Sequence, residues 1–130
     1  MEIKYAKIFV DNQDKALKFS TKTLGFVKKG DISNEGYRWL TVVSPDYQNG
    51  TELILELNSN PAAEKYQKAM FEQNIPAINF VVSDVYAESK RLKKLWVKFT
   101  TEAVEVMEHV IIAVFNDTCG NLIQIQKTGG

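Results

Sequence analysis

The sequence predicts an α+β fold of two βαβββ half-repeats, which together form a curved eight-stranded sheet with helices outside and a concave cup. Three observations predict it. The same order of strands and helix occurs twice, at a period of about 70 residues. Residues that cap helices stand where each predicted helix begins. Each half also carries an Asp…Gly turn before its last strand.

The first half-repeat spans about residues 1–58. Loose alternation over residues 3–10 predicts a strand, and Asp11 and Asn12 can cap the helix that follows. Apolar residues at helical spacing over 13–24, ended by Gly25, predict that helix. The remaining strands are expected at residues 26–32, 37–43 and 52–57.

A connecting helix is expected between the halves, within residues 60–74. Asn60 can act as its N-cap, and Pro61 suits the first helical position. The apolar stripe of this segment predicts a helix over residues 61–73.

The second half-repeat spans about residues 75–128 and repeats the order of the first. A strand at 77–82 is followed by a helix that Ser83 or Asp84 caps and that ends near Leu95. Further strands are expected at 97–101, 110–115 and 122–126. The inner stripe of the helix is predicted to contain Val85, Ser89, Leu92 and Trp96. We expect residues 1–130 to form a single domain.

Composition and charge exclude several classes of protein. The 130 residues are 45% hydrophobic and 25% charged, and 16 basic residues balance 16 acidic ones. A neutral chain has no general attraction for nucleic acid or an anionic membrane, so neither partner is expected. No apolar run approaches the length of a membrane span, and no signal peptide is visible after Met1. One cysteine, Cys119, rules out an intrachain disulfide, so we expect a soluble cytoplasmic protein.

Short motifs at both ends of the chain resemble a known superfamily. The opening strand-helix-turn and the closing turn with its last strand are similar to those of the vicinal-oxygen-chelate superfamily, which includes glyoxalases, bleomycin-resistance proteins and extradiol dioxygenases. The resemblance covers nearly the whole chain. It rests on residues 9–11, 16–19, 24–26 and 116–125.

The resemblance implies a metal-ligand position on each of four cup strands, usually His, Glu or Gln. The matching residues here are Tyr5, Glu56, Ala77 and Gln124. An alanine cannot bind a metal, and a tyrosine binds one only as a phenolate, although its ordinary pKa is about 10. Catalytic metal sites commonly need three protein ligands. We therefore expect no complete metal site and no cofactor; if a divalent metal binds, Glu56 and Gln124 are its candidate ligands.

Several polar and aromatic residues are candidates for ligand binding. Glu56 is either a ligand-contacting residue and catalytic base or a structural carboxylate paired with Lys or Arg. Trp39 either packs in the core or forms an aromatic wall, with Arg38 pairing an anionic ligand group. His109 is a solvent-facing strand-edge residue, a general base or polar contact in the cup, or a metal ligand. The full set of ligand-binding candidates is Tyr5, Tyr37, Arg38, Trp39, Glu56, His109 and Gln124.

The sequence and the resemblance together predict a glyoxalase/bleomycin-resistance-like protein that binds a small, partly apolar or aromatic molecule in its cup. The alternative is a metal-dependent lyase or dioxygenase of the same superfamily with an atypical ligand set. By analogy with the family, we expect a homodimer.

Overall fold

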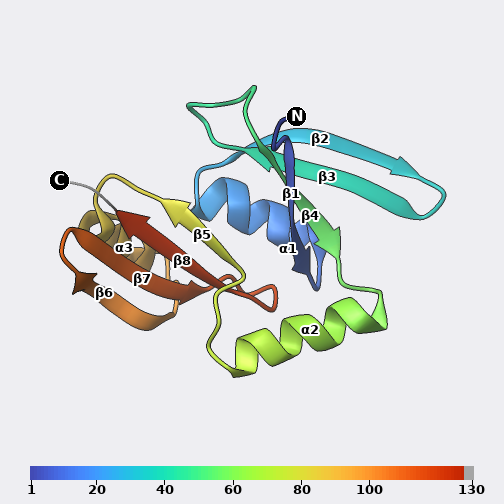
Figure 1. Ribbon diagram of the computed structural model, residues 1–130. Helices are drawn as coiled ribbons and strands as arrows, with labels where there is room; N and C mark the ends of the chain where they lie inside the picture. The colour runs from blue at the N-terminus through green and yellow to red at the C-terminus, as the bar shows by residue number, and fades with distance from the viewer. Residues whose placement is uncertain (128–130) are drawn as a thin grey trace. The chain divides into compact units, whose positions relative to one another are not determined.

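The computed structural model describes residues 1–127, and the predicted end of the second half-repeat, near residue 128, lies just outside them. Within this range the predicted order of elements is confirmed (Figure 1). Eight strands form two four-stranded sheets, one in each half of the described chain. The fold is therefore α+β and built from two βαβββ half-repeats.

The first half contains a mixed sheet with the strand order β1-β4-β3-β2. β1 pairs parallel with β4, while β4 with β3 and β3 with β2 pair antiparallel. Its elements are β1 (Tyr5–Val10), α1 (Gln13–Lys18), η1 (Phe19–Thr23), β2 (Val27–Asn34), β3 (Tyr37–Val43) and β4 (Glu52–Leu57).

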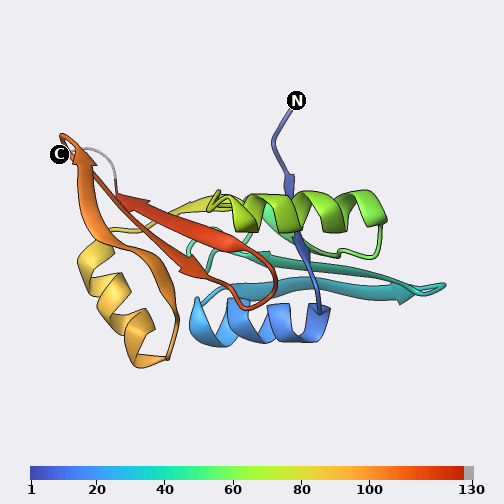
Figure 2. The ribbon, with the colours of Figure 1, turned by 90° about the horizontal axis from the view of Figure 1, so that it is seen from below.

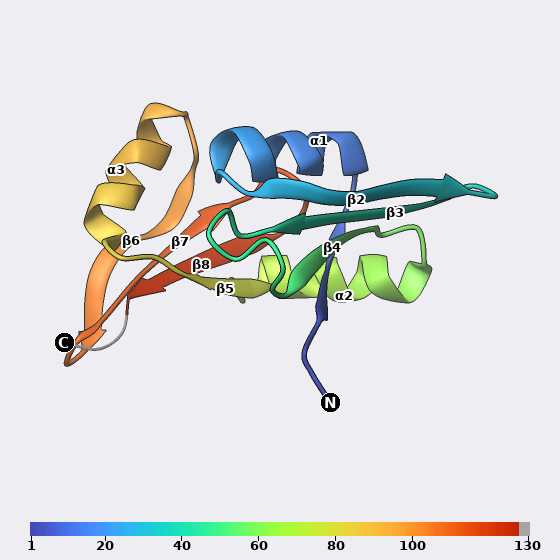
Figure 3. The same ribbon diagram turned by 90° about the horizontal axis from the view of Figure 1, so that it is seen from above.

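Helix α1 begins as the sequence predicted, because the side chain of Asn12 accepts a hydrogen bond from the Lys15 backbone N–H at 2.9 Å. The helix continues as the π-helical segment η1 and lies along one face of the first sheet (Figures 2 and 3). Ala16 of this helix is buried in the apolar layer between helix and sheet. The strands contribute the rest of this apolar layer, which includes Ile8, Val10, Leu40, Val42 and Leu55.

Helix α2 (Pro61–Glu72) follows the first sheet in the chain and matches the predicted connecting helix to within one residue. The Asn60 side chain accepts a hydrogen bond from the Ala62 N–H at 2.8 Å, which satisfies a free donor of the first turn.

The second half repeats the arrangement, with the strand order β5-β8-β7-β6. Asp84 caps α3 by accepting from the Ala87 N–H. The helix buries Val85 and Leu92 beside the sheet residues Phe115, Ile123 and Ile125, which are also buried. The elements are β5 (Ile78–Val81), α3 (Val85–Lys94), β6 (Phe99–Met107), β7 (Val110–Asn116) and β8 (Leu122–Lys127).

Two predictions for the second half need correction. Trp96 was expected in the inner stripe of α3, but it is 84% exposed. The helix ends at Lys94, and Trp96 has a φ of +67°, so it no longer follows the helical spacing. β6 runs to Met107 rather than Thr101, because the bulges in its pairing with β7 break the strict alternation that predicts a strand.

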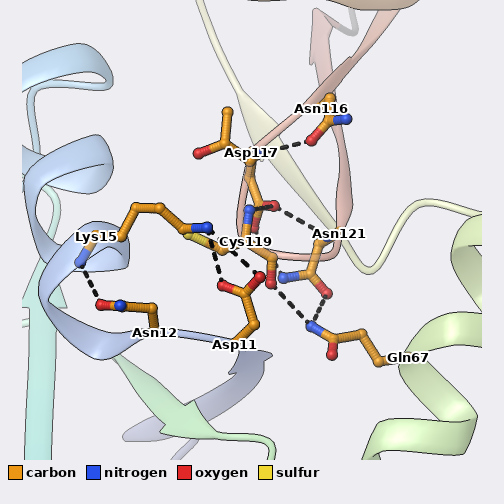
Figure 4. A network of polar contacts seen from close by, with 9 residues as sticks. Asp11, Asn12, Lys15, Gln67, Asn116, Asp117, Cys119 and Asn121 are labelled. Atoms are coloured by element: carbon orange, nitrogen blue, oxygen red, sulfur yellow. Dashed lines mark hydrogen bonds and ion pairs between the residues drawn. The ribbon is translucent and has the colours of Figure 1, made fainter.

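The turn before β8 is fixed by buried polar contacts (Figure 4). The carboxylate of Asp117 accepts hydrogen bonds from the backbone N–H groups of Cys119 and Asn121, at 2.7 and 2.9 Å. Gln67 of α2 donates to the Cys119 carbonyl and to the Asn121 side chain. These bonds set where β8 begins, and with it the position of Gln124.

Among the described residues, no helix is both long and apolar enough to cross a membrane.

Candidate functional site

An exposed aromatic group lies on the face of the first sheet opposite α1. The rings of Tyr5 and Trp39 meet edge to face, with centroids 5.3 Å apart and an interplanar angle of 79°. Trp39 lies above Gly30 of β2, where an added Cβ would come within 3.1 Å of the indole nitrogen. The glycine thus lets the indole approach the neighbouring strand closely. Tyr5 remains 52% exposed, so the pair is open to a ligand.

The carboxylate of Glu56 lies on the same face and is held by two neighbours. The Tyr37 hydroxyl donates to Glu56 Oε1 at 2.7 Å, and Lys7 Nζ lies 3.6 Å from Oε2. The hydrogen bond to Glu56 raises the pKa of Tyr37 above its ordinary value, and desolvation adds to the shift. We call Tyr5, Lys7, Tyr37, Trp39 and Glu56 the aromatic face.

Arg38 points to the opposite side of β3, as neighbours in a strand do. Its guanidinium donates to both oxygens of Asp31, at 2.9 and 3.0 Å, and to Asp14 of α1 at 2.7 Å. These two carboxylates raise the pKa of Arg38 further above its ordinary value, and Arg38 in turn lowers the pKa of Asp31. Arg38 therefore lies outside the aromatic face and ties β3 to β2 and α1.

Gln124 belongs to a cluster of amides on the second sheet, on the face opposite α3. Asn79 Nδ2 donates to Gln126 Oε1 at 2.6 Å, and Gln124 Nε2 donates to the same oxygen at 3.2 Å. We call these three residues the amide cluster. Ala77 directly precedes β5, and its N–H donates to the Leu122 carbonyl, so this position contributes only a methyl group.

The remaining candidates, His109 and Cys119, belong to neither group. His109 lies in the turn between β6 and β7 with a φ of +63°, and its Nε2 lies 3.4 Å from Oε1 of the adjacent Glu108. The Cys119 thiol is buried. Across residues 1–127, no group of three or more His, Cys, Asp or Glu side chains is arranged to hold a metal ion.

Three residues that contribute to these groups were not singled out from the sequence. Lys7 lies two residues after Tyr5, and Gln126 lies two after Gln124, so the two-residue period of a strand could have found both. Asn79 joins Gln124 because the two are paired across parallel strands. That register comes from tertiary pairing, and no local pattern reveals it.

The aromatic face combines two kinds of binding group. Exposed aromatic rings bind planar apolar groups by stacking and edge contacts. A carboxylate that already accepts one hydrogen bond at Oε1 keeps further lone pairs for a ligand donor. The amide cluster offers both donors and acceptors. The groups of the aromatic face suit recognition of a small molecule with an aromatic ring and polar substituents.

Comparison with known proteins gives a consistent family assignment. A family model described as "Glyoxalase/Bleomycin resistance protein/Dioxygenase superfamily" matches residues 2–125. The uncharacterised protein YurT of Bacillus subtilis (strain 168) is 54% identical over 125 residues, which cover 96% of this chain and 98% of that protein.

Solved structures share the fold over nearly their whole length. UcmS2 is 27% identical with a TM-score of 0.84, and the match covers 97% of each chain. A superfamily member from Sphaerobacter thermophilus DSM 20745 is 26% identical with a TM-score of 0.75, covering 97% of this chain and 96% of that one. TnmS3, an antibiotic-binding protein from Streptomyces sp. CB03234, is 22% identical with a TM-score of 0.78, covering 99% and 97%. At this last identity the likeness concerns the fold alone.

Proposed function

The chain belongs to the glyoxalase/bleomycin resistance protein/dioxygenase superfamily, and we propose that it binds a small, partly apolar or aromatic molecule without a metal ion. The observation that carries the proposal is the aromatic face. Tyr5 and Tyr37 are exposed on the same face as the half-buried Trp39, and a group of neighbouring aromatic side chains on a surface is typical of a site that meets a ligand or partner. The structurally similar TnmS3 binds an antibiotic, which is consistent with a ligand of this kind.

In this proposal, a planar ring of the ligand packs against Tyr5 and Trp39. A hydroxyl or amine on the ligand donates a hydrogen bond to Glu56, whose carboxylate is oriented by Tyr37 and Lys7. Aromatic anchors with a few fixed polar groups are the usual composition of small-molecule sites.

The metal-ligand positions of the family do not fit a divalent ion here. The Tyr5 ring packs edge to face against Trp39, a contact that supplies no metal ligand. Ala77 has no donor atom. Glu56 already pairs with a lysine, and a nearby cation competes with a metal for the same oxygens. Gln124 supplies only a neutral amide, so the set lacks the three firm ligands of a catalytic site.

The second candidate function is a metal-dependent lyase or dioxygenase with an atypical ligand set. Glu56 favours it, since this carboxylate occupies a family ligand position on the face away from the helix. A catalytic base at Glu56 would need a substrate proton within hydrogen-bond reach. Glu56 therefore has a role in both candidate functions, and a test for bound metal distinguishes the metal-free binding protein from the metal-dependent enzyme.

Fluorescence of Trp39 tests the proposed ligand site directly. The chain has two tryptophans, so Trp96→Phe leaves Trp39 as the single reporter. We expect neutral hydroxylated naphthalenes and anthraquinones to quench Trp39 saturably in metal-free protein. Tyr5→Ala should weaken binding about five- to tenfold, because one aromatic contact is lost. Glu56→Gln should weaken binding while the domain stays folded and its thermal midpoint falls only slightly.

The matched control is Tyr47→Ala, which removes an exposed tyrosine from the loop between β3 and β4. Its affinity should equal that of the parent. Absence of saturable quenching across the panel would count against the proposal. Equal losses for Tyr5→Ala and Tyr47→Ala would show that binding is not confined to the aromatic face. A Glu56→Gln variant that loses thermal stability but binds normally would make Glu56 structural.

A further inference from the structure

Residues of α3 and β6, in the second half of the chain, line an open pocket of about 510 Å³. None of its lining residues belongs to the aromatic face or to the amide cluster. Its lining comprises Tyr86, Ser89, Lys90, Lys93, Lys94, Glu102 and Ala103. The five lining residues from α3 recur every three or four positions along the helix, so they share one side of it. We call this pocket the α3 groove.

The α3 groove is positively charged. Three lysines and one glutamate line it, which leaves two positive charges. Glu102 neutralises only one of the three lysines, because its Oε2 is paired with Lys93 Nζ at 2.5 Å. Lys90 and Lys94 have no carboxylate within ion-pair distance among the described residues. The ammonium groups of Lys90 and Lys94, one helical turn apart, can therefore both bind the same anion.

Ser89 gives the groove an unsatisfied donor. This residue is only 4% exposed, and its hydroxyl is the buried side-chain group without a hydrogen-bond partner in residues 1–127. Buried hydroxyls are nearly always paired, since an unpaired one loses its hydration without compensation. Ser89 also lines the groove, so a rotation of its side chain places the hydroxyl toward a bound anion. A ligand would supply the partner that the protein lacks.

We propose that the α3 groove binds a phosphate group, carried by a small ester whose organic part rests on Tyr86. Phosphate oxygens accept from ammonium and hydroxyl donors together, and a dianion matches the two uncompensated charges. Tyr86 is 54% exposed at the edge of the groove, where its ring can pack against the ester group. The proposal is independent of the function assigned to the aromatic face.

The phosphate group can belong to a soluble ester or to a lipid headgroup. A lipid is considered because Leu95 and Trp96, directly after Lys94, are 47% and 84% exposed. Apolar and aromatic residues next to lysines are typical of segments that rest on anionic lipid. Both sources place the same phosphate chemistry in the groove.

The test is an NMR titration of the whole chain with inorganic phosphate and with phenyl phosphate. We expect saturable amide shifts concentrated at residues 86–94 and 102–103, with tighter binding of phenyl phosphate. The double variant Lys90→Gln/Lys94→Gln should lose about tenfold or more in affinity, since charge-assisted hydrogen bonds are removed. The matched control is Lys68→Gln, which removes an exposed lysine from α2 and should bind normally.

The Ser89→Ala variant tests whether phosphate binds at a specific position, because it removes a hydroxyl donor without changing the charge of the groove. Removing an unpaired buried hydroxyl should raise the thermal midpoint by a few degrees, yet weaken phosphate binding several-fold. Unchanged binding in this variant would overturn the proposal. So would an equal loss in Lys68→Gln, or shifts that never saturate. A folding failure of the double lysine variant would be recognised in its spectrum, and Ser89→Ala would then decide.

Flotation with vesicles of phosphatidylglycerol and phosphatidylcholine distinguishes the sources. Binding of phenyl phosphate without flotation supports a soluble ester. Flotation that the Lys90→Gln/Lys94→Gln variant and Trp96→Ala both abolish supports a headgroup. Absence of both signals overturns the groove as a phosphate site, and leaves the quenching of Trp39 unaffected.

Discussion

Tyr37 links the chemistry of the aromatic face to a measurable titration. Its hydrogen bond to Glu56 stabilises the neutral phenol, so the pKa of Tyr37 is raised above 10. We predict that Glu56→Gln returns this pKa toward the ordinary value. The difference in tyrosinate absorbance between each protein and its Tyr37→Phe variant isolates this one residue among five tyrosines. Identical titration curves with and without Glu56 would show that the bond is not formed.

The sign of the linked stability follows from the direction of the shift. A raised pKa means that the unfolded chain loses its phenolic proton first as the pH rises. The contribution of Tyr37 to the free energy of unfolding is therefore complete below its unfolded pKa, near 10, and is lost as the pH rises through the folded value. Physiological pH lies well below this window.

Asp31 gives the opposite dependence on pH. The hydrogen bonds from Arg38 lower the pKa of Asp31 below 3.8. Its stabilising contribution is present above that unfolded value and is lost as the pH falls through the lower folded pKa. We predict that Asp31→Asn makes the free energy of unfolding less sensitive to pH below about 4. Urea unfolding at several acidic pH values measures this, with Asp46→Asn in an exposed loop as the control.

At the scale of single elements, the turn before β8 is the most sensitive to substitution. Gly120 has a φ of +100°, and a Cβ added there would lie 2.7 Å from Gln67 Nε2. Gly36 also has a positive φ, +81°, but nothing lies within 4 Å of its added Cβ. We predict that Gly120→Ala lowers the free energy of unfolding by about 1 to 3 kcal/mol more than Gly36→Ala does. Equal losses in chemical denaturation would show that backbone strain alone matters at both turns.

The sequence predicted elements best where local signals agreed. β3 and β4 have the predicted bounds, because aromatic and β-branched residues define one and strict alternation defines the other. β6 was predicted too short, since its bulges depend on pairing with β7. The π-helical segment after α1 was also missed, because its apolar spacing fits an ordinary helix.

The candidate site could be predicted only in part. The two-residue period of a strand predicts from sequence alone that Glu56 faces away from the buried Leu55. It predicts in the same way that Gln124 faces away from the buried Ile123. The partners of these residues could not be predicted in the same way. Lys7 and Tyr37 meet Glu56 from two other strands, and such contacts depend on the strand order of the sheet.

At the scale of the whole molecule, we predict a homodimer. Apolar side chains remain exposed on strands of both sheets, including Ile32 at 66% and Val81 at 76%. Exposed apolar residues on sheet faces are typical of surfaces that another chain or a ligand covers. Light scattering should therefore give a mass near twice the 14.8 kDa of one chain. A mass of one chain at all concentrations would remove this part of the account.

We propose that this superfamily member keeps a ligand-binding face but not the family's metal site. The resemblance places Tyr5 and Ala77 at two of the four ligand positions, and Glu56 pairs with Lys7. The most direct measurement is elemental analysis of the purified chain after loading with nickel, zinc or iron and removal of unbound metal. We predict far less than one ion per chain for each metal. About one firmly bound ion per chain, lost in Glu56→Ala, would contradict the claim and favour the metal-dependent enzyme.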